Sequence, residues 1–132
     1  MRKPPTMGQS KMMEEQQQSS ILIVDDDFAK RKQWKKAFES ATFRVFEAGN
    51  RVDALRYVGD AASGIGLLVI GPMRDGAGAQ FAVEAFQLRP TLPMIIVASA
   101  AYPVGIHDDL AILLEPISDE ELVGTARTLL SR

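Results

Sequence analysis

Four short runs in which every residue is apolar stand out along the chain. Ile21–Val24, Leu67–Ile70, Met94–Val97 and Ala111–Leu114 are four residues long, and this pattern is typical of strands buried on both faces of a sheet. A further stretch, Phe43–Glu47, is rich in aromatic and β-branched residues and also predicts a strand. The sequence therefore predicts five strands.

The stretches between these runs repeat apolar residues every three or four positions, which indicates amphipathic helices. Asp27 and Asn50 are suited to cap the first two helices, and Ser118 with Glu121 forms a capping box before the last one. In the third helix, we expect Phe86 to face inward, together with its apolar neighbours. The predicted helices are 28–41, 50–58, 79–88 and the segment that begins after residue 118.

Strands that alternate with helices predict an α/β fold in which helices cover both faces of a parallel sheet. One connection departs from this scheme. Only residues 98–110 separate the last two predicted strands, close to the minimum of about 12 residues for a parallel crossover. Pro103 and Gly105 lie within it, and both disfavour a helix interior. We expect one or two helical turns there, that is, a shortened fourth helix.

The first 20 residues differ in composition from the rest of the chain. They contain adjacent prolines, a run of three glutamines and few apolar residues, so they are predicted to form a flexible N-terminal leader. The alternative is a short partner-binding helix built on Met7, Met12 and Met13. One domain is predicted over residues 21–132.

Composition excludes several classes of function. The chain has 46% hydrophobic and 24% charged residues and a net charge of −2, so it offers no basic field for nucleic acid. It has no cysteine, which excludes disulfides and thiolate chemistry. No apolar run approaches the roughly 20 residues of a membrane helix, and the N-terminus does not resemble a signal peptide. We expect a cytoplasmic protein.

Candidate chemistry belongs at the carboxyl ends of the strands, where open α/β sheets bind ligands. The residues that follow the predicted strands there are Asp25, Asp26, Gly71, Ala98 and Glu115. Two acids thus follow the first strand, whereas a glycine without a side chain follows the third.

Four segments resemble the receiver domains of two-component response regulators: "ILIVDDD", "FRVFEAGNRVDAL", "GAQFAVEAFQLRPTLPMIIVASA" and "LLEPIS". The resemblance implies a flavodoxin-like, CheY-like fold. Its doubly wound sheet has five parallel strands in the order 2-1-3-4-5, here with a shortened fourth helix. It also implies a role in two-component or phosphorelay signalling.

An active receiver accepts a phosphoryl group on an aspartate after strand three, with Mg²⁺ held by two acids after strand one. Asp25 and Asp26 match these metal-binding acids. Gly71 stands where the acceptor aspartate belongs, Ala98 where a Ser or Thr belongs, and Glu115 where a lysine belongs. The resemblance therefore implies a degenerate pseudo-receiver.

Aspartyl-phosphate chemistry needs a nucleophile and positive charge near the transferred group. Gly71 removes the nucleophile, and Glu115 reverses the charge of the lysine. The sequence therefore predicts a non-catalytic module, with no enzyme activity at the usual site and no cofactor. Asp25, Asp26 and Glu115 would crowd three carboxylates. This set is interpreted as an acidic remnant, with a divalent-cation site left open as the alternative.

The first predicted helix carries five basic residues within seven positions: Lys30, Arg31, Lys32, Lys35 and Lys36. One interpretation is a docking face, because the first helix of receivers contacts histidine kinases and phosphotransfer proteins. The other is an ordinary solvated helix face. A protein partner is expected, nucleic acid and membrane are not, and a homodimer is left open.

Two further functions remain as alternatives. A displaced carboxylate such as Asp75 or Asp27 would make the chain a phosphorylatable response regulator. A small hydrophobic ligand in the altered site would make it a small-molecule-sensing domain. The displaced acceptor is disfavoured because Asp75 lies four residues beyond Gly71 and no lysine follows Lys36.

Overall fold

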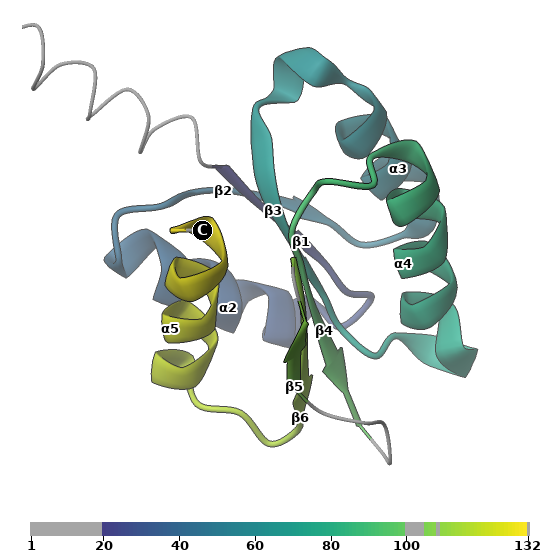
Figure 1. Cartoon of the computed structure of the whole chain (residues 1–132). Helices are drawn as coiled ribbons and strands as arrows, with labels where there is room; N and C mark the ends of the chain where they lie inside the picture. Colours follow the sequence, from purple (N-terminus) through teal and green to yellow (C-terminus); the bar gives the residue numbers. More distant parts are fainter. Residues whose placement is uncertain (1–19, 100–104, 108, 132) are drawn as a thin grey trace, which may run out of the picture.

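A computed structural model describes residues 20–99, 105–107 and 109–131 of the chain (Figure 1). Its strands are β1 (Ser20–Val24), β2 (Arg44–Ala48), β3 (Ile65–Ile70), β4 (Met94–Ala98), β5 (Gly105–His107) and β6 (Leu110–Leu114). Its helices are α2 (Phe28–Ser40), α3 (Arg51–Gly59), α4 (Ala77–Leu88) and α5 (Asp119–Leu130). Two 3₁₀ turns, η1 (Ala61–Ser63) and η2 (Arg74–Gly76), complete the described elements.

The strands form one sheet in the order β2-β1-β3-β4-β6-β5. Every neighbouring pair from β2 to β6 is parallel, and only the pair between β5 and β6 is antiparallel. When β6 is counted as the fifth predicted strand, the parallel part has the predicted order 2-1-3-4-5. The predicted α/β fold class is confirmed.

The helices form a layer on each side of the sheet (Figure 1). On one side α2 and α5 pack over a core that contains Trp34, Phe38 and Leu122. On the other side α3 and α4 pack over a second core that contains Val58 and Phe81. Since β1 is buried at every position, it separates the two cores, as the apolar run Ile21–Val24 predicts.

The predicted helix caps are present. The side chains of Asp27, Asn50 and Ser118 each accept a hydrogen bond from a backbone N–H three residues further on. These bonds satisfy N–H groups of the first helical turn that have no partner within the helix. They fix where α2 and α5 begin beside the carboxyl ends of the strands.

The connection before β6 differs from the prediction. Gly105–His107 forms strand β5, whereas one or two helical turns were expected in this connection. Its backbone pairs with β6 from Leu110 to Ile112, which uses the outer edge of that strand. Pro103 lies outside the described residues. In the described part of the chain no α-helix lies between β4 and β6, so the α4 side of these strands lacks a helix.

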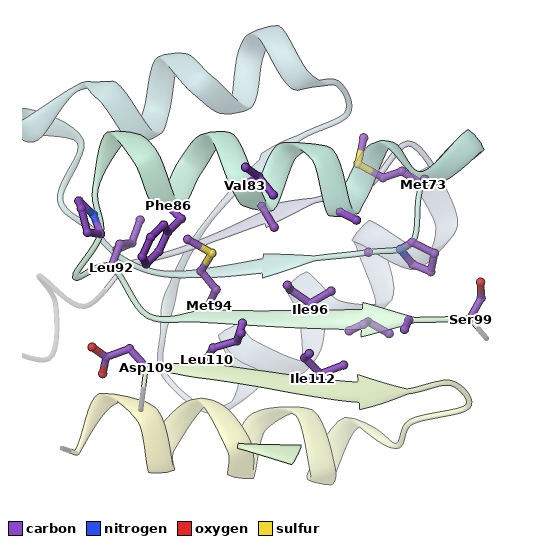
Figure 2. Close-up of a pocket in the computed structure, with 18 residues that line it drawn as sticks. Met73, Val83, Phe86, Leu92, Met94, Ile96, Ser99, Asp109, Leu110 and Ile112 are labelled. Atoms are coloured by element: carbon purple, nitrogen blue, oxygen red, sulfur yellow. The ribbon is translucent and has the colours of Figure 1, made fainter. Parts of the chain in front are cut away.

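This difference explains a second one. Phe86 of α4 was predicted to face inward, but 57% of its surface is exposed. It points over β4 and β6, where a further helix would have covered it (Figure 2).

The first described residue, Ser20, is buried and begins β1, one residue before the predicted strand. Residues 1–19, which make up the rest of the predicted leader, lie outside the described part. The division into a leader and a domain therefore stays a prediction.

Candidate functional site

The sheet brings the predicted site residues together at one edge. Val24 pairs with Ile70, so Asp25 and Gly71 follow at the same level on neighbouring strands. The backbone N–H of Glu115 donates to the carbonyl oxygen of Ala98 at 2.8 Å, which joins the other two positions. The register thus gathers both pairs at the carboxyl ends of the strands.

The side chain of Asp25 fills the space beside Gly71. A Cβ atom added to Gly71 would lie 1.8 Å from Oδ2 of Asp25 and 2.5 Å from its Cγ. The backbone N–H of Gly71 also donates to the carbonyl oxygen of Val24 at 2.8 Å, which holds the two strands in place. No side chain fits at position 71 unless Asp25 moves. The position is therefore both empty of a nucleophile and closed to one.

A second glycine tightens this arrangement. A Cβ atom on Gly78, in the first turn of α4, would lie 2.2 Å from the carbonyl oxygen of Gly71. The start of α4 therefore packs directly on the backbone that follows β3. Glycines at both positions allow this close approach.

Asp25 is an unusual carboxyl group because it is only 1% exposed. Its Oδ1 accepts a hydrogen bond from the backbone N–H of Asp27 at 2.9 Å, but Oδ2 has no hydrogen-bond partner in the structure as described. Burial raises the pKa of Asp25, and the Asp27 N–H and the charge of Lys30 only partly oppose this. The site thus favours the protonated form of this carboxyl more than water does.

Asp26 and Asp27 have structural contacts of their own. Oδ2 of Asp26 accepts a hydrogen bond from the backbone N–H of Arg74 at 3.0 Å, which connects the loop after β1 to η2. Oδ1 of Asp27 accepts the N–H of Lys30 at 3.1 Å as the cap of α2. Both carboxylates therefore position the loops around the site.

Glu115 forms an ion pair with Lys30. Nζ of Lys30 lies 2.7 Å from Oε2 of Glu115, and about a quarter of each side chain is exposed. Burial lowers the pKa of Lys30, but the hydrogen bond and charge of Glu115 outweigh it, so the net shift is upward. The acid that follows β6 is therefore paired with a lysine of α2.

This pair was not predicted from the sequence. Glu115 was expected to crowd Asp25 and Asp26, and Lys30 was assigned to the basic cluster of the first helix. The sequence did hold a signal for the pair. Lys30 lies in the first turn of α2, and this helix begins at the same sheet edge as Glu115. Among the described residues, no three acidic or histidine side chains gather closely enough to hold a metal ion. The cation-site alternative for Asp25, Asp26 and Glu115 therefore has no geometric support.

Most of the basic cluster on α2 is also paired within the chain. Arg31, Lys32 and Lys35 all reach Glu47 of β2, at 3.2, 2.9 and 3.6 Å. Burial raises the pKa of Glu47, but hydrogen bonds from Lys32 and Arg31 outweigh it and lower the pKa overall. Arg31 also donates to the carbonyl oxygen of Asp25 at 2.8 Å. Three of the five basic residues thus tie α2 to β2.

Lys36 differs from the other four, since it has no ion pair within the residues that the structure describes. It lines a shallow groove of about 660 Å³ between α2 and α5. Arg127 of α5 also lines this groove, together with two acids of the same helix, Asp119 and Glu120. The face between α2 and α5 therefore keeps exposed charges of both signs.

A larger apolar groove of about 870 Å³ lies on the α4 side of β4 and β6. Figure 2 shows Val83 and Phe86 of α4 on one wall and Ile96, Leu110 and Ile112 of the strands on the other. It begins beside Gly71 and Ala98 and ends at Leu92 and Asp109. Among the described residues, no helix covers this face of β4 and β6.

Within the described ranges, the structure has no helix that is both long and apolar enough to cross a membrane.

No family model matches the sequence, and no curated protein matches it either. Solved structures do match. A CheY-like response regulator receiver domain protein from Methanospirillum hungatei JF-1 has a TM-score of 0.73 at 22% identity, covering 86% of this chain and 94% of that one. A receiver domain protein from Clostridium thermocellum gives 0.72 at 18%, covering 86% and 95%. Vibrio cholerae chemotaxis protein CheY4 gives 0.71 at 20%, covering 85% and 98%.

This chain covers 94%, 95% and 98% of the length of these three neighbours. Their low sequence identity limits the conclusion to architecture. The described chain therefore has the fold of a response regulator receiver domain.

Proposed function

We propose that this chain is a non-catalytic receiver-like module that acts through protein–protein contact in a two-component or phosphorelay pathway. The carboxyl of Asp25 in the place of an acceptor side chain carries this proposal. Gly71 has no nucleophilic side chain, and the carboxyl of Asp25 sterically blocks any side chain introduced at that position. The module is not phosphorylated at the usual site.

The charges around the site support the same function. In phosphoryl transfer, cations must face the transferred group. Here the lysine nearest the site, Lys30, is engaged by Glu115, and Arg31 is engaged by Glu47 and the backbone of Asp25. These cations serve as internal ties between α2 and the strands. The site is therefore a structural element of the module.

Treatment with acetyl phosphate and Mg²⁺, followed by intact mass spectrometry, tests the chemistry. We expect no addition of a phosphoryl group, while a receiver that retains its acceptor aspartate is modified in parallel. The Gly71→Asp variant should also remain unmodified, because Asp25 fills the required space. Modification of the unaltered chain, mapped by peptide mass spectrometry to Asp75 or Asp27, would instead support the displaced-acceptor alternative.

The face between α2 and α5 is the proposed contact surface for a helical signalling partner. Receivers use their first helix for such contacts, and Lys36 offers a basic group there without an ion pair in the described structure. Because exposed charges act mainly on association, the interaction should weaken as salt rises.

Affinity capture from the native lysate, followed by titration of the purified partner, tests this surface. Lys36→Glu should weaken binding, whereas Arg56→Glu should not. Arg56 makes the same charge change at an exposed position of α3, which covers the opposite face of the sheet. Equal binding by both variants would remove the proposed surface.

A further inference from the structure

The apolar groove beside α4 has no role in the proposed function. Ile96, Leu110 and Ile112 are only partly buried, and Phe86 is more than half exposed. In a doubly wound fold, this face of the outer strands is normally covered by a helix. The exposed apolar groove therefore calls for an occupant.

Its dimensions suit a short segment of chain. β4 and β6 are five residues each, so the groove follows them for about 17 Å at about 3.3 Å per residue. That length accommodates about 11 helical residues at about 1.5 Å per residue. The charged residue that lines it is Asp109, at the end formed by the start of β6. A matching segment would be apolar in its middle and basic at one end.

In the segment before β1, Lys11, Met12 and Met13 have this character, and Glu14 and Glu15 follow on the other side of the methionine pair. Residues 1–19 contain four of the six methionines of the chain and no Leu, Ile, Val, Phe, Trp or Tyr. Met12 and Met13 follow directly after Lys11. Methionine side chains are flexible and polarisable, so they adapt well to irregular apolar surfaces. The two remaining methionines, Met73 and Met94, already line the groove.

The segment also joins β1 at the sheet edge that is closest to the Asp109 end of the groove. Leu22 of β1, Leu68 of β3, Met94 of β4 and Leu110 of β6 lie in one row across the strands. Ser20 precedes this row by two residues, on the side where Asp109 lies. The groove is displaced from β1 by between two and three strand spacings, about 10 to 15 Å, and a segment packed over the sheet would lie about 10 Å above it. Seven residues separate Met13 from Ser20, and they span up to about 23 Å.

We propose that the segment before β1 folds back over the sheet and places Met12 and Met13 in the groove, with Lys11 facing Asp109. The segment then covers the face that a fourth helix covers in a complete doubly wound fold. This inference is independent of the α2–α5 contact surface, since the groove lies on the other side of the sheet.

A nitroxide spin label on the full-length chain tests the proposal. Because the chain has no cysteine, Ser10→Cys provides a single attachment site next to Lys11. We expect the label to broaden the amide signals of Ile96, Leu110 and Ile112 selectively. The amide of Lys36, on the opposite side of the sheet, should keep its intensity. Broadening that is absent from the groove overturns the proposal.

Matched variants in the same helix identify the contact. Phe86 lines the groove and Leu88 does not, yet they are 57% and 54% exposed. Phe86→Ser should therefore remove most of the broadening and Leu88→Ser should leave it intact. The double change Met12→Ser and Met13→Ser should also remove it. Equal broadening in all variants would show that the methionines and the groove are not the contact.

A mixed sample separates this contact from association between copies. Spin-labelled chain without ¹⁵N is combined with unlabelled ¹⁵N chain, so that broadening reports only contacts between molecules. We expect no broadening in the groove of the ¹⁵N chain. Broadening there would assign the groove to a second copy and overturn the intramolecular proposal.

Discussion

Strands β1 and β3 on one side of the sheet and β4 and β6 on the other are similarly apolar but differ in their cover. On the first side, α2 lies over one face and α3 and α4 lie over the other, so β1 is buried at every position. On the second side, α5 covers one face and the other forms the apolar groove. The two sides therefore differ in the helices around the strands far more than in the strands themselves.

This difference shows which interactions hold the outer strands. β6 keeps a full parallel register with β4, and from Leu110 to Ile112 it also has an antiparallel partner in β5. In the described part of the chain, this pairing holds the strand without a crossover helix. Its inward side chain Ala111 packs in the core under α5. Hydrogen bonding and one apolar face are enough to retain the strand order. A helix on the second face adds burial to an arrangement that already exists.

Replacing two leucines that lie in one row of the sheet should give the largest difference in stability between the two sides. Leu68 of β3 is fully buried, whereas Leu110 of β6 is only partly buried on the same face. Leu68→Ala should lower the free energy of unfolding by about 2–5 kcal/mol, because it leaves a cavity in the core. Leu110→Ala should cost less than half as much, because its side chain already borders the groove. Urea denaturation followed by Trp34 fluorescence measures both changes.

Equal losses for the two variants would contradict the view that the second side buries its apolar residues less completely. They would mean that Leu110 is as well packed in solution as Leu68. If the segment before β1 covers the groove, changing Met12 and Met13 to serine should reduce the cost of Leu110→Ala and leave that of Leu68→Ala unchanged.

Gly71→Ala tests the tight packing on the enclosed side. The new methyl group would lie 1.8 Å from Oδ2 of Asp25, so the two groups cannot both keep their places. The free energy of unfolding should fall by about 1–3 kcal/mol. Gly124→Ala is the control, because nothing lies within 4 Å of its added Cβ and the residue is inside α5. There the helix should gain about 0.5–1 kcal/mol.

A double variant identifies the group that causes the clash. If the carboxyl of Asp25 is responsible, Asp25→Ala should cancel most of the loss caused by Gly71→Ala in a double-mutant cycle. Additive losses in the two single variants would assign the effect to the backbone near Gly78.

The enclosed side was also the more predictable from sequence. The runs Ile21–Val24 and Leu67–Ile70 identify β1 and β3 because a strand covered on both faces must be apolar at every position. The β4–β6 connection was harder, since Pro103 and Gly105 signal a weak helix but not a strand that pairs with β6. Phe86 was assigned inward for a related reason. Its spacing marks the apolar face of α4, whereas its exposure depends on whether a neighbouring helix is present.

The candidate site was predictable in its positions but not in its contacts. Strand ends placed Asp25, Gly71, Ala98 and Glu115 at one edge, because parallel strands end together. Oδ2 of Asp25 fills the space beside Gly71. This contact depends on the orientation of the Asp25 side chain, which a sequence pattern does not specify. The pair between Lys30 and Glu115 joins residues 85 positions apart, and only the packing of α2 against the sheet brings them together.

The pH dependence of the free energy of unfolding tests the raised pKa of Asp25. A raised pKa in the fold means that the folded state holds this proton more tightly than the unfolded chain. The stabilisation is complete below the unfolded pKa of about 3.9 and is lost as pH rises through the folded pKa. Asp25→Asn should remove this loss, because an amide carries no charge to desolvate. The variant should gain about 1–3 kcal/mol over the unaltered chain near neutral pH.

Subtracting the two stability curves isolates this effect. Glu47 has a lowered pKa and contributes the opposite slope, with stability that is lost as pH falls through its folded pKa. Its contribution is common to both proteins and cancels in the difference. A difference that stays constant between pH 4 and 7 would show that Asp25 titrates normally.

The smallest effect is expected where the two sides are joined. The ion pair between Lys30 of α2 and Glu115 after β6 connects the enclosed side to the open one, and both side chains are about a quarter exposed. Because water screens the pair, Glu115→Gln should cost no more than about 1 kcal/mol, and less in high salt. The raised pKa of Lys30 predicts a second effect of the ion pair, on the stability at alkaline pH.

A lysine with a raised folded pKa stabilises the fold below its unfolded pKa of about 10.4, and that contribution is lost as pH rises through the folded pKa. Removing Glu115 should abolish this alkaline loss, whereas Glu39→Gln, which removes an exposed acid on the same helix, should leave it unchanged. An equal response to both changes would mean that the ion pair adds nothing measurable to the β3–β4 pairing that already joins the two sides.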